Sequence, residues 1–342
     1  MICTKTGTRP AHGILAMLTI VFILGVSGKD VLSDELKSVG QSLKKNILII
    51  AGPITGHGKN AHEYEKSAIL LKHLLDRSDN VDQLNVSVVF NGWPDDLRLL
   101  TEANTIVMIS DGGDRRESDH PLYVGDRLRQ LEIQMKRGCG LVHLHWTTFH
   151  PSRYHEKITQ WVGGYFDYQK GDASNGWYSA IKHYTEPIKI GEPDHPIVNG
   201  VRPFRLLEEF YYRIRFREND SRLSKIVLSR PPGETKDYAV GWSVERKDGG
   251  RGFGFTGGHY FANWWDPNFR KMVLNAIVWT SGILVPAEGV QSKLEEPVKA
   301  LVLTGYNHPA HDWSKTTAAL IQVIENDPRV LVDVQEDPEF LA

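Results

Sequence analysis

Cysteine is scarce in this chain. Its 342 residues include only two, Cys3 and Cys139, which excludes a disulfide-built scaffold and a cysteine-rich zinc module. Neither sign of charge dominates, since 40 Lys and Arg stand against 42 Asp and Glu, and nucleic-acid binders normally show a basic excess. Hydrophobic residues make up 41 %, enough to bury a core, which excludes disorder along the whole length. Histidine and aromatic residues, in contrast, are abundant. The chain has 14 His, 9 Trp and 12 Tyr, which indicate a polar, aromatic-lined site.

One apolar run, residues 14–26, follows basic residues and precedes small ones. This order is typical of a secretory signal peptide, and the run is short of the roughly 20 residues that a membrane span needs. We therefore expect a signal peptide at 1–28 and a polar linker at 29–43. The protein would be periplasmic or secreted, or anchored at the membrane through an uncleaved signal segment.

After residue 44, short apolar runs alternate with segments of helical periodicity. The order strand, helix, strand predicts an α/β fold, a doubly wound and mostly parallel sheet with helices on both faces. Charged and bulky apolar side chains alternate in residues 213–217, and this alternation predicts an exposed strand. The predicted strands are 46–51, 86–90, 105–110, 140–145 and 252–256, and the predicted helices are 62–77, 126–137 and 267–279.

Ligands of parallel sheets bind at the carboxyl ends of the strands. The polar loops that follow these ends are therefore candidate site segments. They contain His57 and His62 after the first strand, residues 111–116 after the third, residues 145–150 after the fourth, and His259 after the glycine-rich strand.

The sequence of the C-terminal segment is similar to that of the beginning of the domain. Residues 299–305 are similar to 45–52, and 311–315 are similar to 62–66. One strand-helix-strand unit cannot bury its own apolar face, so the unit either docks on the first domain or is the remnant of a truncated second copy, which we favour. We expect a complete domain at 44–285, a linker at 286–297 and an incomplete repeat at 298–342.

Four segments, taken in order, resemble the trehalose-utilisation (ThuA-like) family. They are the loop with His57 and His62, residues 138–145, residues 194–200, and residues 251–259 continued by 275–279. The resemblance covers about 44–282. It implies the class I glutamine amidotransferase-like fold, a flavodoxin-like sandwich, and an association with sugar catabolism.

The same resemblance permits a test for a catalytic thiol. Amidotransferase relatives carry a nucleophilic cysteine on the turn after the strand that matches 140–144, where the elbow exposes it. This chain has His145 there, while Cys139 precedes the strand. We therefore exclude a Cys-dependent glutaminase and interpret Cys139 as a small packing residue.

The candidate catalytic residues are His145, His259 and Glu209. The two imidazoles can transfer protons near neutral pH, and Glu209 matches an acidic position that precedes an aromatic pair in the family better than Glu208 does. We expect substrate-binding roles for His57, His62, Trp146, Trp264, Trp265 and Tyr211. The alternative is that these histidines are hydrogen-bonded structural groups.

The sequence identifies no cofactor, but it contains a candidate ligand set for a divalent metal. His57, His145 and His259 are the candidate ligands, and Glu209 could complete a His/carboxylate set. No pair among them has the His-x-x-x-His spacing of a helical metal motif.

Taken together, these patterns favour an exported enzyme that performs acid/base chemistry, either isomerisation or hydrolysis, on a sugar or keto-sugar derivative. One alternative is a non-catalytic carbohydrate-binding or scaffold protein on the same fold. A further alternative is a metal-dependent hydrolase. The expected partner is a small sugar, without nucleic acid, and the substrate and oligomeric state stay open.

Overall fold

The computed structural model describes residues 44–53, 61–169, 178–305, 312–324 and 327–336. The predicted signal peptide and linker, at 1–43, lie outside the described residues, as does His57.

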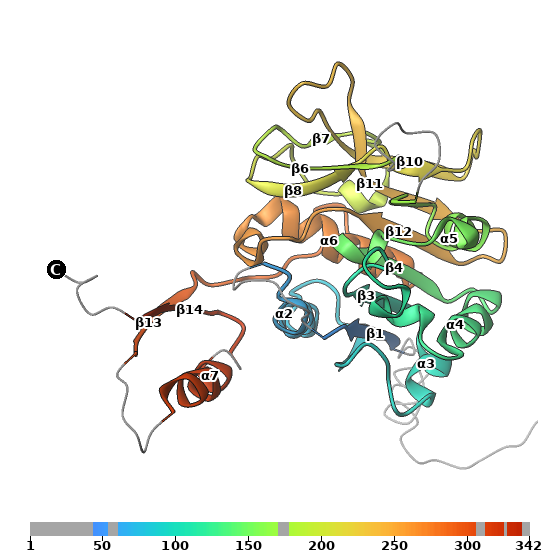
Figure 1. Cartoon of the computed structure of the whole chain (residues 1–342). Helices are drawn as coiled ribbons and strands as arrows, with labels where there is room; N and C mark the ends of the chain where they lie inside the picture. The colour runs from blue at the N-terminus through green and yellow to red at the C-terminus, as the bar shows by residue number, and fades with distance from the viewer. Residues whose placement is uncertain (1–43, 54–60, 170–177, 306–311, 325–326, 337–342) are drawn as a thin grey trace, which may run out of the picture. The chain divides into compact units, whose positions relative to one another are not determined.

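The centre of the fold is an eight-stranded sheet in the order β2-β1-β3-β4-β12-β11-β10-β7 (Figure 1). The pairs from β2 to β12 are parallel and the remaining pairs are antiparallel. The α/β prediction is confirmed. In sheet order the strands are Leu84–Val89, Lys45–Ala51, Thr105–Ile109, Gly140–Leu144, Arg251–Phe255, Tyr238–Glu245, Leu223–Ser229 and Lys189–Ile190.

Both faces of the parallel half are buried under helices. Alternate residues of β1 point to opposite faces, so Ile47 and Ile49 pack in one core while Leu48 and Ile50 pack in the other. The first core is closed by α2 (Tyr64–Asp76) and α6 (Pro267–Thr280). The second is closed by α3 (Arg98–Glu102), α4 (Arg127–Lys136) and α5 (His155–Trp161).

Helix α6 begins where its sequence specifies a start. The Asp266 carboxylate accepts the backbone N–H groups of Asn268 and Phe269 at 2.9 Å, and Pro267 occupies the first turn, where its missing N–H costs nothing. The helix ends before Gly282, whose φ of 84° favours glycine.

Two shorter sheets extend the fold. Strand β6 (Ala180–Tyr184) pairs antiparallel with β8 (Glu208–Tyr212), while β5 (Gly164–Tyr165) pairs with β9 (Arg215–Phe216). The strand predicted at 213–217 is therefore wrong except for residues 215 and 216. Arg213 has a φ of 57°, in the left-handed region, and this turn separates β8 from β9.

The C-terminal segment contains the strand-helix-strand order that its sequence predicts. Strands β13 (Val298–Leu303) and β14 (Val330–Gln335) pair parallel in a sheet of their own, with α7 (Trp313–Ile324) between them in the chain. The origin of this unit as a repeat stays a prediction.

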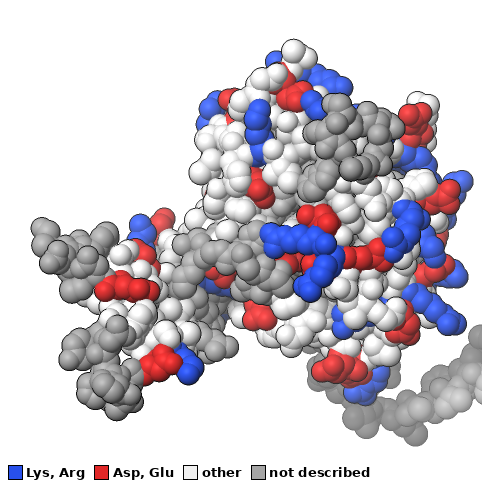
Figure 2. All heavy atoms as spheres, viewed as in Figure 1, with Lys and Arg blue, Asp and Glu red and all other residues white. Residues whose placement is uncertain are grey.

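The surface carries charges of both signs. Figure 2 shows basic and acidic side chains interspersed over the described residues of the face that it draws. Within the part of the chain that the structure describes, no helix combines the length and apolarity that crossing a bilayer requires.

Candidate functional site

Four polar side chains meet near the carboxyl ends of the parallel strands. His145 follows β4, His259 follows β12, His62 precedes α2, and Glu209 comes from β8. One nitrogen or carboxylate oxygen from each lies within 4.8 Å of the corresponding atoms of the others. The structure thus brings together the three predicted catalytic residues and one predicted substrate-binding residue, and we call these four the His/Glu cluster.

Glu209 is the centre of this cluster. Its carboxylate lies 3.1 Å from Nδ1 of His259, 3.6 Å from Nε2 of His145 and 3.0 Å from Nε2 of His183. Burial alone would raise the pKa of Glu209, but the close approach of His259 and the charges of the imidazoles outweigh it and lower the pKa to about 2. Glu209 therefore stays a carboxylate at neutral pH.

His145 occupies the turn directly after β4. Its φ of 52° lies in the left-handed region, a strained conformation for a residue with a side chain. Nδ1 lies 2.8 Å from the carbonyl oxygen of Thr256, and Nε2 lies 2.7 Å from the hydroxyl of Tyr211, whose ring stacks on the imidazole. Tyr211 therefore contacts His145, and both rings are buried; its expected role in substrate binding stays a prediction.

His62 is held by a chain of two further groups. Its Nδ1 lies 2.7 Å from the Tyr64 hydroxyl, which donates to the Asp111 carboxylate at 2.7 Å. Burial raises the pKa of Asp111 to about 6, against the opposing effect of the Tyr64 hydrogen bond. His62 also has a positive φ, 56°, and its backbone N–H donates to the His259 carbonyl.

Glu208 anchors the loop that carries His259. Its fully buried carboxylate accepts the backbone N–H groups of Gly258 at 2.9 Å and His259 at 3.0 Å, and the Asn263 side-chain amide at 2.9 Å. Burial raises the pKa of Glu208 to about 7 despite these bonds. Since adjacent strand residues point to opposite faces, only Glu209 joins the His/Glu cluster, as the sequence analysis favoured.

The three tryptophans with an expected substrate-binding role do not all lie beside the His/Glu cluster. Trp264 is 1 % exposed and its indole N–H donates to Ser67, so it belongs to the core between α2 and α6. Trp265 is half-buried against the same core and donates to the Glu295 carbonyl. The Trp264 ring is thus used in packing, which speaks against stacking on a substrate there, while the substrate-binding role of Trp265 stays a prediction. Trp146 does contact His62, with 5.1 Å between ring centroids, but it is itself buried.

His183 is a member of the site that the sequence analysis missed. It lies directly opposite Glu209 in the β6–β8 register, and 48 % of its side chain is exposed. Its Nδ1 lies 3.0 Å from the Tyr260 hydroxyl. The only signal that could have found it is the pairing of two strands that are distant in the sequence.

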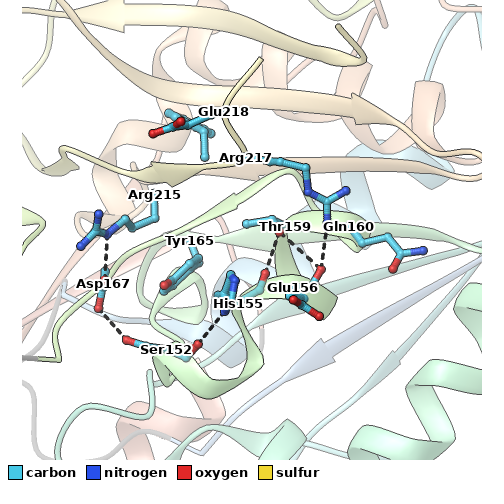
Figure 3. A pocket seen from close by; sticks show the side chains of 11 residues that line it. Ser152, His155, Glu156, Thr159, Gln160, Tyr165, Asp167, Arg215, Arg217 and Glu218 are labelled. Carbon is cyan, nitrogen blue, oxygen red and sulfur yellow. Dashed lines mark hydrogen bonds and ion pairs between the residues drawn. The ribbon is translucent and has the colours of Figure 1, made fainter. Parts of the chain in front are cut away.

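A separate polar cavity of about 670 Å³ lies beside β5 and β9 (Figure 3). Asp167 bridges Arg215 and Ser152 there, with both contacts at 2.9 Å. No residue of the His/Glu cluster lines this cavity, and two of its charged groups, Asp167 and Arg215, already pair with each other. Size alone therefore does not make it the candidate site.

Cys139 lies at the opposite end of β4 from His145. It is 2 % exposed, and burial raises the pKa of its thiol to about 11. A thiol in this state is a poor nucleophile, in agreement with the packing role expected from its position.

Two solved ThuA-like structures share this fold. No curated protein matches the chain. A putative ThuA-like protein from Bacteroides uniformis aligns with a TM-score of 0.51 at 14 % identity, covering 70 % of this chain and 93 % of its own. A second, from Parabacteroides merdae, aligns with a TM-score of 0.50 at 17 % identity, covering 74 % and 98 %. A glutamine amidotransferase from Thermotoga maritima aligns with a TM-score of 0.37 at 9 % identity, covering 70 % and 99 %. The family model for ThuA, described as trehalose utilisation, matches residues 54–280, and the chain belongs to this family.

Proposed function

We propose that this protein is an enzyme of carbohydrate catabolism that transfers protons on a sugar or keto-sugar, in an isomerisation or a hydrolysis. The family description, trehalose utilisation, supports the carbohydrate class. The observation that carries the chemistry is one ionised carboxylate within 3.0 to 3.6 Å of three imidazole nitrogens at the carboxyl end of a parallel sheet.

This arrangement suits acid/base catalysis. Imidazole both accepts and donates protons near neutral pH, and the Glu209 carboxylate stabilises whichever ring becomes protonated. His145 and His259 are the predicted proton-transfer groups, and His183 joins them because it is the most exposed of the three. In an isomerisation, a base removes a proton from the hydroxyl-bearing carbon next to a carbonyl, and an acid returns one to the former carbonyl carbon. The hydroxyl proton passes to the former carbonyl oxygen, so the carbonyl moves by one carbon and no atom is gained or lost. A hydrolysis consumes one water instead.

The test is a substrate screen followed by NMR in D₂O. Purified protein is incubated with disaccharides, including trehalose, and with their keto derivatives. Isomerisation through proton transfer at carbon incorporates deuterium into the product, whereas hydrolysis releases a second sugar without it.

Matched variants assign the reaction to the site. We expect Glu209→Gln and His259→Asn to lower kcat by about 10²-fold or more, the usual contribution of a positioned acid or base. His155→Asn removes an exposed imidazole outside the cluster and should keep full turnover. Unchanged turnover in both cluster variants would refute the proposal. Glycan binding without turnover in the wild type, retained by both variants, would instead favour a carbohydrate-binding protein.

A further inference from the structure

The donor set of the His/Glu cluster has the composition and spacing of a metal centre. Three imidazole nitrogens and one carboxylate oxygen lie within 4.8 Å of one another. Two of the separations that involve Glu209 are 3.1 Å and 3.6 Å. Ligand atoms about 2.0 to 2.1 Å from a tetrahedral ion are separated by about 3.3 Å. Small side-chain movements would therefore bring all four ligand atoms within bonding distance of one ion.

The surroundings of His145 fix which of its nitrogens carries hydrogen. The Thr256 carbonyl can only accept a hydrogen bond, so Nδ1 at 2.8 Å must donate to it. In the neutral ring, Nε2 then carries a lone pair, and this is the atom near Glu209. Metal-ligating histidines commonly donate their other ring N–H to a backbone carbonyl in this way.

The surroundings of His62 also fix which of its ring nitrogens carries hydrogen, and here the partner is a tyrosine hydroxyl. The Tyr64 hydroxyl has one proton and donates it to Asp111, which can only accept while ionised. Nδ1 of His62 is therefore the donor to the Tyr64 oxygen at 2.7 Å, which leaves the lone pair on Nε2. The His62 ring lies 4.8 Å from the His145 ring and 4.6 Å from the His259 ring, measured between centroids.

The Tyr211 hydroxyl faces two acceptors of the cluster. Tyr211 has one hydroxyl proton for two acceptors, Nε2 of His145 at 2.7 Å and the Glu209 carboxylate at 3.1 Å. Nδ1 of His259 is buried and makes no hydrogen bond of acceptable geometry, although it lies close to Glu209. A buried polar atom without a hydrogen-bond partner needs an explanation, and a bound cation is one that also fits the spacing of the cluster.

From these contacts we propose that His62, His145, Glu209 and His259 bind one divalent transition-metal ion. Imidazole-rich sets with one carboxylate suit zinc, manganese, iron, cobalt or nickel, whereas magnesium and calcium prefer all-oxygen sets. The two left-handed histidine residues support this assignment, because strained backbone concentrates at ligand-holding positions.

A bound ion would refine the proposed function, although its binding does not depend on catalysis. A divalent cation polarises a carbonyl or hydroxyl oxygen of a sugar. The four ligands would then hold the ion, and His183, outside the ligand set and half-exposed, would be the imidazole left to transfer protons.

The first experiment measures metal in the full chain. We expect about one transition-metal ion per chain by elemental analysis after purification without chelator. After removal of the metal by chelation, added Co²⁺ should give a visible ligand-field band that saturates at one equivalent and that Zn²⁺ abolishes. Absence of metal as purified, together with absence of a saturating Co²⁺ band, would overturn the proposal without reference to any variant.

The second experiment assigns the ligands. His62→Asn and His145→Asn are chosen because asparagine tolerates a positive φ better than most residues, and Glu209→Gln keeps the shape of the side chain. Each should weaken Co²⁺ binding more than about 100-fold, beyond the effect of losing an outer-shell partner. His155→Asn should bind as the wild type does. Circular dichroism confirms that each variant is folded, and equal Co²⁺ affinity in wild type and all three folded variants would overturn the assignment.

Turnover separates this inference from the proposed function. Stoichiometric metal without turnover of any sugar supports the metal site while the proposed function fails. Full turnover by protein that carries no metal as purified and gives no saturating Co²⁺ band supports the proposed function while the metal inference fails.

Discussion

Acid should destabilise this protein through His120, a histidine outside the His/Glu cluster. Its ring is fully buried, Nε2 donates to the Thr147 carbonyl at 3.1 Å, and Nδ1 accepts the backbone N–H of Leu122 at 3.2 Å. The neutral ring is thus completely hydrogen-bonded. A second proton would break the bond to Leu122 and bury a charge, and this burial lowers the pKa of His120 to about 4.

The size of the effect follows from the two pKa values. In the unfolded chain His120 titrates near 6.5, so the unfolded state binds a proton first as the pH falls. Stability is then lost between about pH 6.5 and pH 4, and is fully present above this range. A difference of about 2.5 pKa units corresponds to about 3 kcal/mol in total, of which about 2 kcal/mol is lost between pH 7 and pH 5.

Urea unfolding at pH 7 and pH 5, followed by circular dichroism, measures this loss. His120→Asn keeps an acceptor for the Leu122 N–H but does not titrate, so its stability should fall by about 2 kcal/mol less than that of the wild type between the two pH values. Burial also lowers the pKa values of His143 and His150, which remain in both proteins, and His155→Asn controls for the loss of an exposed imidazole. Equal pH dependence in wild type and His120→Asn would refute the reasoning.

Three further predictions concern stability and reactivity. Cys139 should resist iodoacetamide at pH 8 in the native protein and react fully in urea, which mass spectrometry detects; native labelling would contradict its burial. Arg246→Met should lower the free energy of unfolding by about 3 kcal/mol in urea titrations, because the buried guanidinium bonds the Cys139 carbonyl at 2.8 Å and pairs with Asp248; a loss below about 1 kcal/mol would show that these bonds contribute little. Gly254→Ala should cost about 1 to 3 kcal/mol in the same assay, because its Cβ would overlap the Trp242 ring; unchanged stability would show that the ring moves away freely.

The parallel half of the fold could be predicted because its signals are local. Continuous apolar runs bounded by polar loops placed β1, β3 and β4 within a residue or two of their observed limits. In the fold that the family resemblance implies, the carboxyl ends of the strands converge on one crevice, so His145 and His259 were expected to lie together.

The parts that could not be predicted depend on long-range packing. The contact of His183 with Glu209 requires the register of β6 against β8, which no local pattern encodes. The burial of Trp264 was missed because an aromatic side chain near a site has the same sequence signal whether it packs in a core or faces a ligand. The turn at Arg213 was missed because a positive φ at arginine has no sequence signal.

The order in which the cluster residues occur along the chain has a consequence for biosynthesis. Chains emerge from the ribosome N-terminus first, so His62 and His145 are made well before Glu209 and His259. A nascent chain that stops before β12 holds two of the imidazoles but lacks the third and its loop. Any ligand that needs all four groups therefore binds only to the finished domain, and it adds its binding free energy to the folded state alone. Occupancy of the site would in this way distinguish completed molecules from unfinished ones.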